Sequence, residues 1–149
     1  MTGMLAVLLS ALLAGTLDIA ATGSLMRAQG TPIRRLLQFV ASGALGASAF
    51  EGGIGTAIAG LALHFVVAGI WALIYFTIAD RWPSLGALPV LSGALYGAAV
   101  HVLMSRIVVP LSRAAKRPFS WKAWLTQLAI HIICVGIPIA WLQTYWLSR

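Results

Sequence analysis

The chain has 149 residues, of which 60% are hydrophobic and 9% charged, and its mean hydropathy is +0.94. Soluble domains carry about 25% charged residues, so this composition excludes a water-soluble globular protein and predicts an integral membrane protein. The net charge of +7 does not indicate a nucleic-acid partner, because the basic residues cluster in two short loops, as in the cytoplasmic loops of membrane proteins.

The first predicted span covers residues 4–26. It lacks a basic n-region and is longer than the apolar core of a signal peptide, which has about 7–15 residues. We therefore interpret it as a retained membrane helix. Gly15 and Asp18 fall at helical spacing with Ala11 and Thr22, so one face of this helix is small or polar.

Residues 34–50 form a shorter apolar segment after the first span. Its uninterrupted part, Leu36–Phe50, is too short to cross a bilayer, which takes about 20 residues. We expect an interfacial helix behind the paired arginines Arg34 and Arg35, with a re-entrant segment as the alternative. Glu51 follows at a glycine-rich joint and is either a solvated partner of these arginines or a carboxylate at the mouth of a pathway.

Three further apolar runs predict membrane helices over residues 54–79, 87–110 and 123–147. Small residues recur on one face of these runs, where two helix backbones can approach closely in lipid. Pro138 is expected to kink the last helix. The predicted fold is one all-α polytopic membrane domain, residues 1–149, with four transmembrane helices and a short interfacial or re-entrant helix after the first. The glycines assigned to helix packing are Gly15, Gly60, Gly93 and Gly97.

The basic residues set the predicted orientation. Three arginines follow the first span and four basic residues follow the third, whereas the loop after the second has one Arg beside one Asp. The positive-inside rule then puts the two basic loops in the cytoplasm and both termini outside, in the periplasm. Arg106, near the end of the third span, is interpreted as a snorkelling anchor; the alternatives are a partner for Asp18 or for a lipid phosphate.

Four ionisable residues, one from each span, have similar predicted depths. Counted at 1.5 Å per residue from the cytoplasmic ends of the helices, the depths are roughly 10, 15, 13 and 12 Å for Asp18, His64, His101 and His131. Ionisable groups inside a membrane are costly unless they are paired or hydrated. The common depth therefore indicates one buried polar site on the cytoplasmic side of the midplane.

Three chemistries fit such a layer. Three imidazoles and a carboxylate suit Zn²⁺ or Fe²⁺, and Cys134, three residues after His131, is an additional candidate ligand. Two histidines from different helices could hold a haem b. Histidine and Asp18 could also relay protons, because imidazole changes its charge near neutral pH. In a purely structural bundle the same side chains would bond neighbouring helices to each other.

The sequence carries no catalytic motif. A nucleophile–base pair, a phosphate-binding loop, a dinucleotide motif and a CxxC pair are all missing from it. Soluble-type enzymology therefore has no support, and a membrane-embedded metalloenzyme is a minor alternative.

The second half of the chain, residues 63–141, resembles the YagU-like family of small bacterial inner-membrane proteins. The resemblance rests on the strings LHFVVAGIWALIYFTIADRWP, LSGALYGAAVHVLMSRIVVP and IHIICVGIPIAW, whose histidines, His64, His101 and His131, fall at the places of the family's histidines. The first third departs from the family in its shorter loop, so the resemblance does not extend to the acidic residues there. It implies the fold and the inner membrane, and no mechanism.

From these observations we predict a small multi-pass inner-membrane protein that handles protons or metal ions by transport or binding. His64, His101 and His131 would be the ligands or relay groups, with Asp18 as the counter-charge. The alternatives are a non-catalytic accessory subunit of a larger membrane complex and a haem-binding bundle. Because four short helices enclose little space, their small-residue faces also predict a homo-oligomer or docking into a larger complex within the lipid bilayer.

Overall fold

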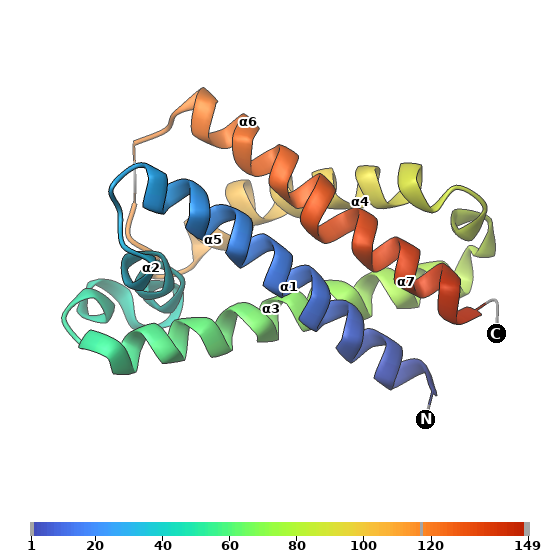
Figure 1. The fold of residues 1–149 in the computed structure, drawn as a ribbon, viewed down its shortest axis with the longest axis horizontal. Coiled ribbons are helices and arrows are strands. Elements are labelled where there is room, and N and C mark those ends of the chain that lie inside the picture. Colours follow the sequence, from blue (N-terminus) through green and yellow to red (C-terminus); the bar gives the residue numbers. More distant parts are fainter. Residues whose placement is uncertain (1, 117, 148–149) are drawn as a thin grey trace.

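Four long helices lie alongside one another in the computed structural model, which describes residues 2–116 and 118–147 (Figure 1). Each is long and apolar enough to cross a membrane, with a mean hydropathy of 1.6 to 2.2 over 18 residues. The part of the chain that the structure describes contains no β-strand, so the all-α polytopic prediction is confirmed. The four candidate spans are Gly3–Ala28, Gly53–Arg81, Pro89–Leu111 and Trp121–Trp146.

The first two spans are continuous α-helices, α1 (Thr2–Ala28) and α3 (Gly53–Arg81). Each of the other two contains a wider, π-helical segment. The third span joins α4 (Pro89–Leu103), the π-helical η3 (Met104–Val108) and α5 (Val109–Leu111). The fourth joins α6 (Trp121–Ile130), the π-helical η4 (His131–Gly136) and α7 (Ile137–Leu147). The connecting elements are α2 (Ile33–Leu45) and two 3₁₀ turns, η1 (Gly46–Phe50) and η2 (Pro83–Ala87).

Both π-helical segments end two residues before a proline. η3 precedes Pro110 and η4 precedes Pro138. Proline has no N–H to donate, and its ring clashes with the carbonyl four residues earlier in a regular α-helix. A wider turn is one way in which a helix absorbs this conflict. Pro138 therefore interrupts the α-helical geometry of the fourth span, and the interruption begins at His131.

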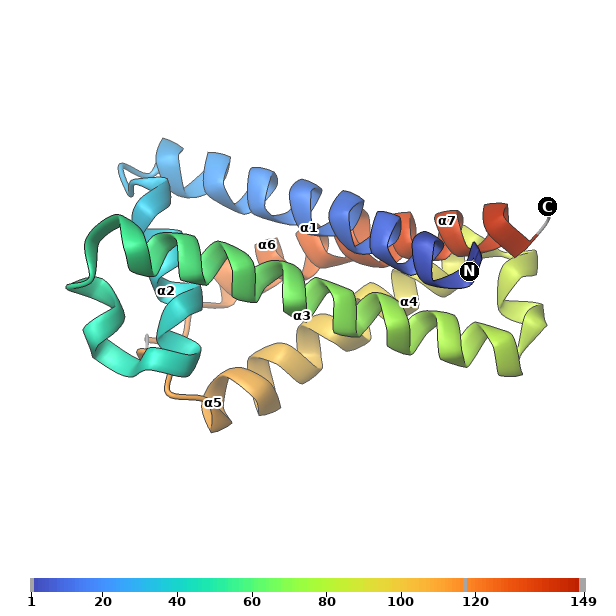
Figure 2. The ribbon, with the colours of Figure 1, turned by 90° about the horizontal axis from the view of Figure 1, so that it is seen from below.

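Both ends of the described chain lie at one end of the bundle, and α2 lies across the other end (Figures 1 and 2). α1 packs against α3, η4 and α7, whereas α4 packs against η4 and α7. α2 packs mainly on α3. Its Gln38 Nε2 donates to Gly53 O (3.0 Å), and the N–H of Arg113 donates to Gly43 O (3.0 Å). These bonds fix α2 to α3 and to the loop after α5.

Small residues fill the centre of the bundle, and large apolar residues cover its outside. Ala14 and Ala72 are fully buried, whereas Leu8, Ile58 and Val66 are more than half exposed. A soluble protein rarely exposes so many large apolar side chains together. The distribution fits helices that meet through small residues and face hydrocarbon with large ones.

The predicted packing glycines lie where helices meet. A Cβ on Gly93 would be 2.7 Å from a carbonyl oxygen of η4, and a Cβ on Gly97 would be 2.5 Å from another. Gly15 faces the ring of Phe65, and Gly60 faces the backbone of α2. At Gly93 and Gly97 any side chain would therefore push α4 away from the fourth span.

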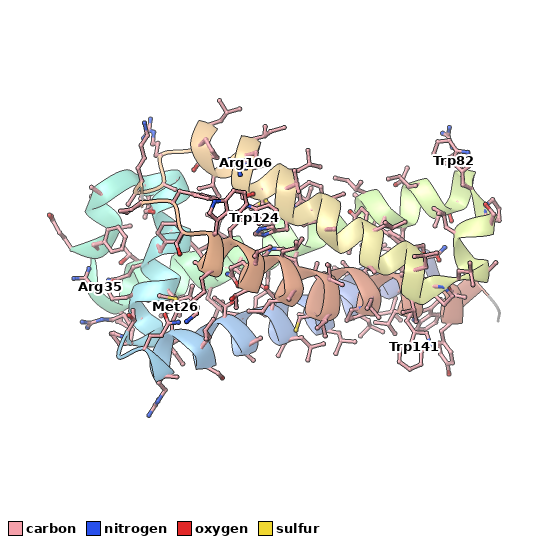
Figure 3. The ribbon with its side chains drawn as sticks, turned by 90° about the horizontal axis from the view of Figure 1, so that it is seen from above. Met26, Arg35, Trp82, Arg106, Trp124 and Trp141 are labelled. Atoms are coloured by element: carbon pink, nitrogen blue, oxygen red, sulfur yellow. The ribbon has the colours of Figure 1, made fainter. Side chains whose placement is uncertain are left out.

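Aromatic and basic residues mark the two ends of the bundle (Figure 3). Trp82 and Trp141 lie at the end that holds the termini and are 61% and 68% exposed. Arg35, Arg106 and Trp124 lie at the end with α2. Exposed tryptophans near a helix end are typical of a membrane interface, so each end of the bundle carries residues suited to the edge of a bilayer.

Candidate functional site

Asp18 on α1 faces His131 at the start of η4. The Nδ1 atom of His131 is 3.9 Å from Asp18 Oδ1, and the two side chains are 18% and 15% exposed. The same Nδ1 is 2.9 Å from the backbone oxygen of Gln127. In the neutral ring this nitrogen therefore carries the proton and donates it to that carbonyl, which leaves Nε2 as an acceptor. A second proton on the ring would make an ion pair with Asp18.

His101 on α4 lies on the other side of His131. Its side chain is buried, at 5% exposure, and its ring centroid is 5.1 Å from that of His131. It also contacts Trp124, edge to face, at 4.8 Å between centroids. Two buried polar atoms of this group, Asp18 Oδ1 and His101 Nε2, have no hydrogen-bond partner among the described residues. Asp18, His131 and His101 thus form a row of polar groups from three elements, which we call the Asp–His row.

His64 on α3 is held apart from this row. Its Nε2–H donates to the backbone oxygen of Gly15 at 2.8 Å, one turn before Asp18 on the same helix. This bond joins α3 to α1 directly. The His64 ring therefore holds two helices together through Nε2. Its other ring nitrogen, Nδ1, is the atom that could still bind a proton or a ligand.

A cavity of about 400 Å³ lies beside the Asp–His row. Helices α1, α2 and α3 and the third and fourth spans all contribute to its lining. Most of the lining is apolar, including Phe39, Val67 and Trp71. Its polar side chains come from Asp18, Thr22, His64, Ser112, Gln127 and His131. The volume falls in the range of about 300–1,000 Å³ that is usual for small-molecule sites.

Helix α2 closes one end of this cavity. Leu36, Phe39 and Val40 on its inner face belong to the lining. The helix is held in place by the Gln38 and Gly43 bonds described above, and the N–H of Ala115 donates to Ser42 Oγ at 3.3 Å. Helix α2, over residues 36–44, therefore contributes one wall of the site, a role that the length and composition of this segment alone do not show.

Arg106 lies away from Asp18. Its side chain is exposed, and its guanidinium lies over the rings of Phe119 (5.2 Å) and Trp124 (5.8 Å). The ion-pair partner of Asp18 among the described residues is His131. Among the described residues Arg106 therefore forms no ion pair with Asp18, and its guanidinium lies over two aromatic rings instead.

Glu51 and Cys134 do not join the Asp–His row. Glu51 is exposed and forms no ion pair with any residue that the structure describes. The expected pairing with Arg34 or Arg35 is therefore not formed, and the guanidinium of Arg35 lies over the ring of Phe50 at 5.4 Å. Cys134 is a half-buried free thiol on η4, outside the cavity lining.

The residues that the structure describes do not group into the metal site expected from the sequence. Over residues 2–116 and 118–147, no three His, Cys, Asp or Glu side chains are grouped closely enough to hold a metal ion. His64 is occupied at Gly15, so the four-residue ligand set expected from the sequence is not assembled. A haem bound by His101 and His131 would have to stand between their rings, and these rings contact each other.

Several contacts near the site were not anticipated. Trp124 contacts His101 edge to face and donates from Nε1 to Ser105 Oγ at 3.1 Å. Its spacing of seven residues from His131, two helical turns, is the sequence signal that could have placed it on the same face. Trp71 and Phe39 in the cavity wall have no comparable signal, because their role depends on how the helices are rotated.

No family model, curated protein or solved structure matches the chain. The resemblance to the YagU-like family therefore stays a prediction, and the functional argument depends on the geometry.

Proposed function

We propose that this membrane protein handles protons at the Asp–His row. The observation that supports the proposal best is that two buried atoms of this row, Asp18 Oδ1 and His101 Nε2, make no hydrogen bond with any described residue, while Asp18 Oδ1 lies 3.9 Å from His131 Nδ1. A buried polar atom without a partner is costly in a purely structural bundle. In a proton-handling site the same atom is a position for a proton in transit.

The chemistry follows from the hydrogen bond of His131. Its Nδ1–H is committed to Gln127 O, so an incoming proton binds at Nε2. The resulting imidazolium is stabilised by the carboxylate of Asp18 at 3.9 Å. His101, with its ring centroid 5.1 Å away, offers Nε2 as the next acceptor. Because two imidazolium ions so close together repel each other, the histidine pair carries at most one extra proton, and so one positive charge, at a time.

The proposed setting is the bacterial inner membrane with the α2 end in the cytoplasm. The loops at that end carry most of the arginines and lysines, and both described ends of the chain lie at the opposite end (Figure 1). α2 itself, with exposed Arg34 and Arg35 and an apolar inner face, suits a helix that lies in the interface. Both termini would then be periplasmic, and the Asp–His row would be reached from the cytoplasmic side.

Metal handling has less support from this geometry, since the ligands that it needs are not grouped. An accessory, structural role is supported by one contact, the bond from His64 to Gly15. That bond explains His64 without any transport. It does not explain why Asp18 Oδ1 and His101 Nε2 are buried without a hydrogen bond to any described residue.

Proton flux into liposomes tests the proposal. Purified protein is reconstituted with a pH-sensitive dye inside, and a potassium gradient with valinomycin sets the membrane potential. We expect acidification with the wild type and at least a tenfold lower rate with Asp18→Asn and with His131→Gln. Asp80→Asn is the matched control, because Asp80 is an exposed carboxylate at the far end of α3. Equal flux in wild type and Asp18→Asn, or none in the folded wild type, would overturn the proposal.

A further inference from the structure

The cavity beside Asp18 combines an apolar wall with a single acidic group. Asp18 is the one acidic side chain among its described lining residues, and no lysine or arginine of the described chain lines it. The imidazoles of His64 and His131 are its other ionisable groups. Each of these rings already donates one N–H to a backbone carbonyl. The cavity therefore carries one unbalanced carboxylate in largely apolar surroundings.

We propose that this cavity binds a small organic cation with an apolar body. The inference goes beyond proton handling: it shares Asp18 and the lining residue His131 with the Asp–His row, but does not involve His101. The carboxylate supplies the counter-charge, and the volume of about 400 Å³ accommodates a molecule of small-ligand size. A neutral ligand would leave the carboxylate with His131 as its only ionisable neighbour among the described residues, and an anion would be repelled by it.

The aromatic wall favours the same ligand class. Trp71 from α3 and Phe39 from α2 both line the cavity. A cation near the face of an aromatic ring is attracted by the ring's quadrupole, most strongly where water is excluded. Quaternary ammonium groups are bound in this way in aromatic-lined sites. An inorganic metal ion would gain little from such walls, because hard cations need several oxygen ligands.

The apolar part of the ligand would lie against the aliphatic lining. Val67 and Ala68 from α3, Val40 from α2 and Val100 from α4 contribute to this surface. Because α2 closes one end of the cavity, a ligand inside would contact α2 and the main bundle together. We therefore expect binding to strengthen the attachment of α2 as well as to fill the cavity.

Direct binding of radiolabelled benzyltrimethylammonium to the purified, immobilised protein in maltoside detergent tests this inference. We expect saturable one-site binding by the wild type and by Asp80→Asn. Asp18→Asn should weaken binding at least tenfold, and Asp18→Glu, which keeps the charge, should recover part of it. Neopentylbenzene, the uncharged isostere of the probe, should compete at least tenfold less well than unlabelled probe.

A cavity-filling variant separates binding inside the cavity from binding to any exposed carboxylate. Val67→Phe leaves Asp18 unchanged and should reduce binding at least tenfold, provided that its thermal unfolding shows a folded protein. Unchanged binding in Asp18→Asn or in folded Val67→Phe, or no saturable binding by the wild type, would overturn the inference. His101→Gln distinguishes the two proposals, because His101 belongs to the Asp–His row but not to the cavity lining. It should keep cation binding while losing proton flux, so each proposal can fail without the other.

Discussion

Replacing Gly97 with alanine tests whether the close approach of α4 and η4 positions the candidate site. A Cβ at this position would be 2.5 Å from His131 O and 2.8 Å from the Cα of Ile132, whereas an ordinary contact is at least 3.4 Å. The two backbones would have to separate locally by about 0.9 Å. Overpacking of this kind costs about 1–3 kcal/mol, and the better helix propensity of alanine returns up to about 1 kcal/mol.

We therefore expect Gly97→Ala to lower the free energy of unfolding by about 1–2 kcal/mol. The measurement is equilibrium unfolding by SDS in mixed maltoside micelles, followed by circular dichroism. Gly69→Ala is the matched control, because its Cβ would meet only Ala11 at 4.0 Å and should leave stability unchanged or slightly raised. Since the shift moves His131 relative to His101, proton flux should also fall. If Gly97→Ala unfolds like the control, the packing of these two helices is looser than described.

Three further variants test single contacts. His64→Leu should lower the unfolding free energy by about 1 kcal/mol in the same assay, because a bond between two helices is lost, and leave proton flux near the wild-type rate. Trp124→Leu should lower it by about 2–3 kcal/mol, because His101 loses its aromatic neighbour; an unchanged midpoint would contradict this contact. Gln38→Ala should speed amide hydrogen exchange in α2, measured by mass spectrometry, because its bond to Gly53 is removed, while exchange in α4 stays the same.

Helix positions could be predicted from the sequence, because they depend on one segment at a time. The span predicted over residues 54–79 corresponds to α3 at Gly53–Arg81, and that predicted over 87–110 to Pro89–Leu111. The shared depth of Asp18 and His131 follows from counting along two helices. The same counting cannot tell which neighbour a side chain faces.

The contacts of each side chain depend on how its helix is rotated about its own axis. That rotation is set by packing between helices, which the sequence of one segment does not show. His64 has the depth of the other ionisable residues, but it faces Gly15 and donates to its carbonyl. The sequence allows three interpretations of Arg106, because its helix end could face several partners. In the structure its guanidinium lies over two aromatic rings of the following segment. The cavity depends on α2 folding back across the bundle, a long-range arrangement that leaves no periodic signal.

The position of His131 follows from two features of the chain that act on the same short segment. Gly97 allows the backbone of η4 to approach α4, and Pro138 ends the π-helical turn that begins at His131. Wide turns of this kind are frequent at functional sites, because they change the direction of side chains without breaking the helix. In a regular α-helix the side chains before and after Pro138 would point in directions set by one unbroken helical repeat. With the π-helical turn, the first residue of η4 can face Asp18 on α1 while its backbone packs on α4. One histidine can therefore contact both the carboxylate and His101, as a relay between two helices requires.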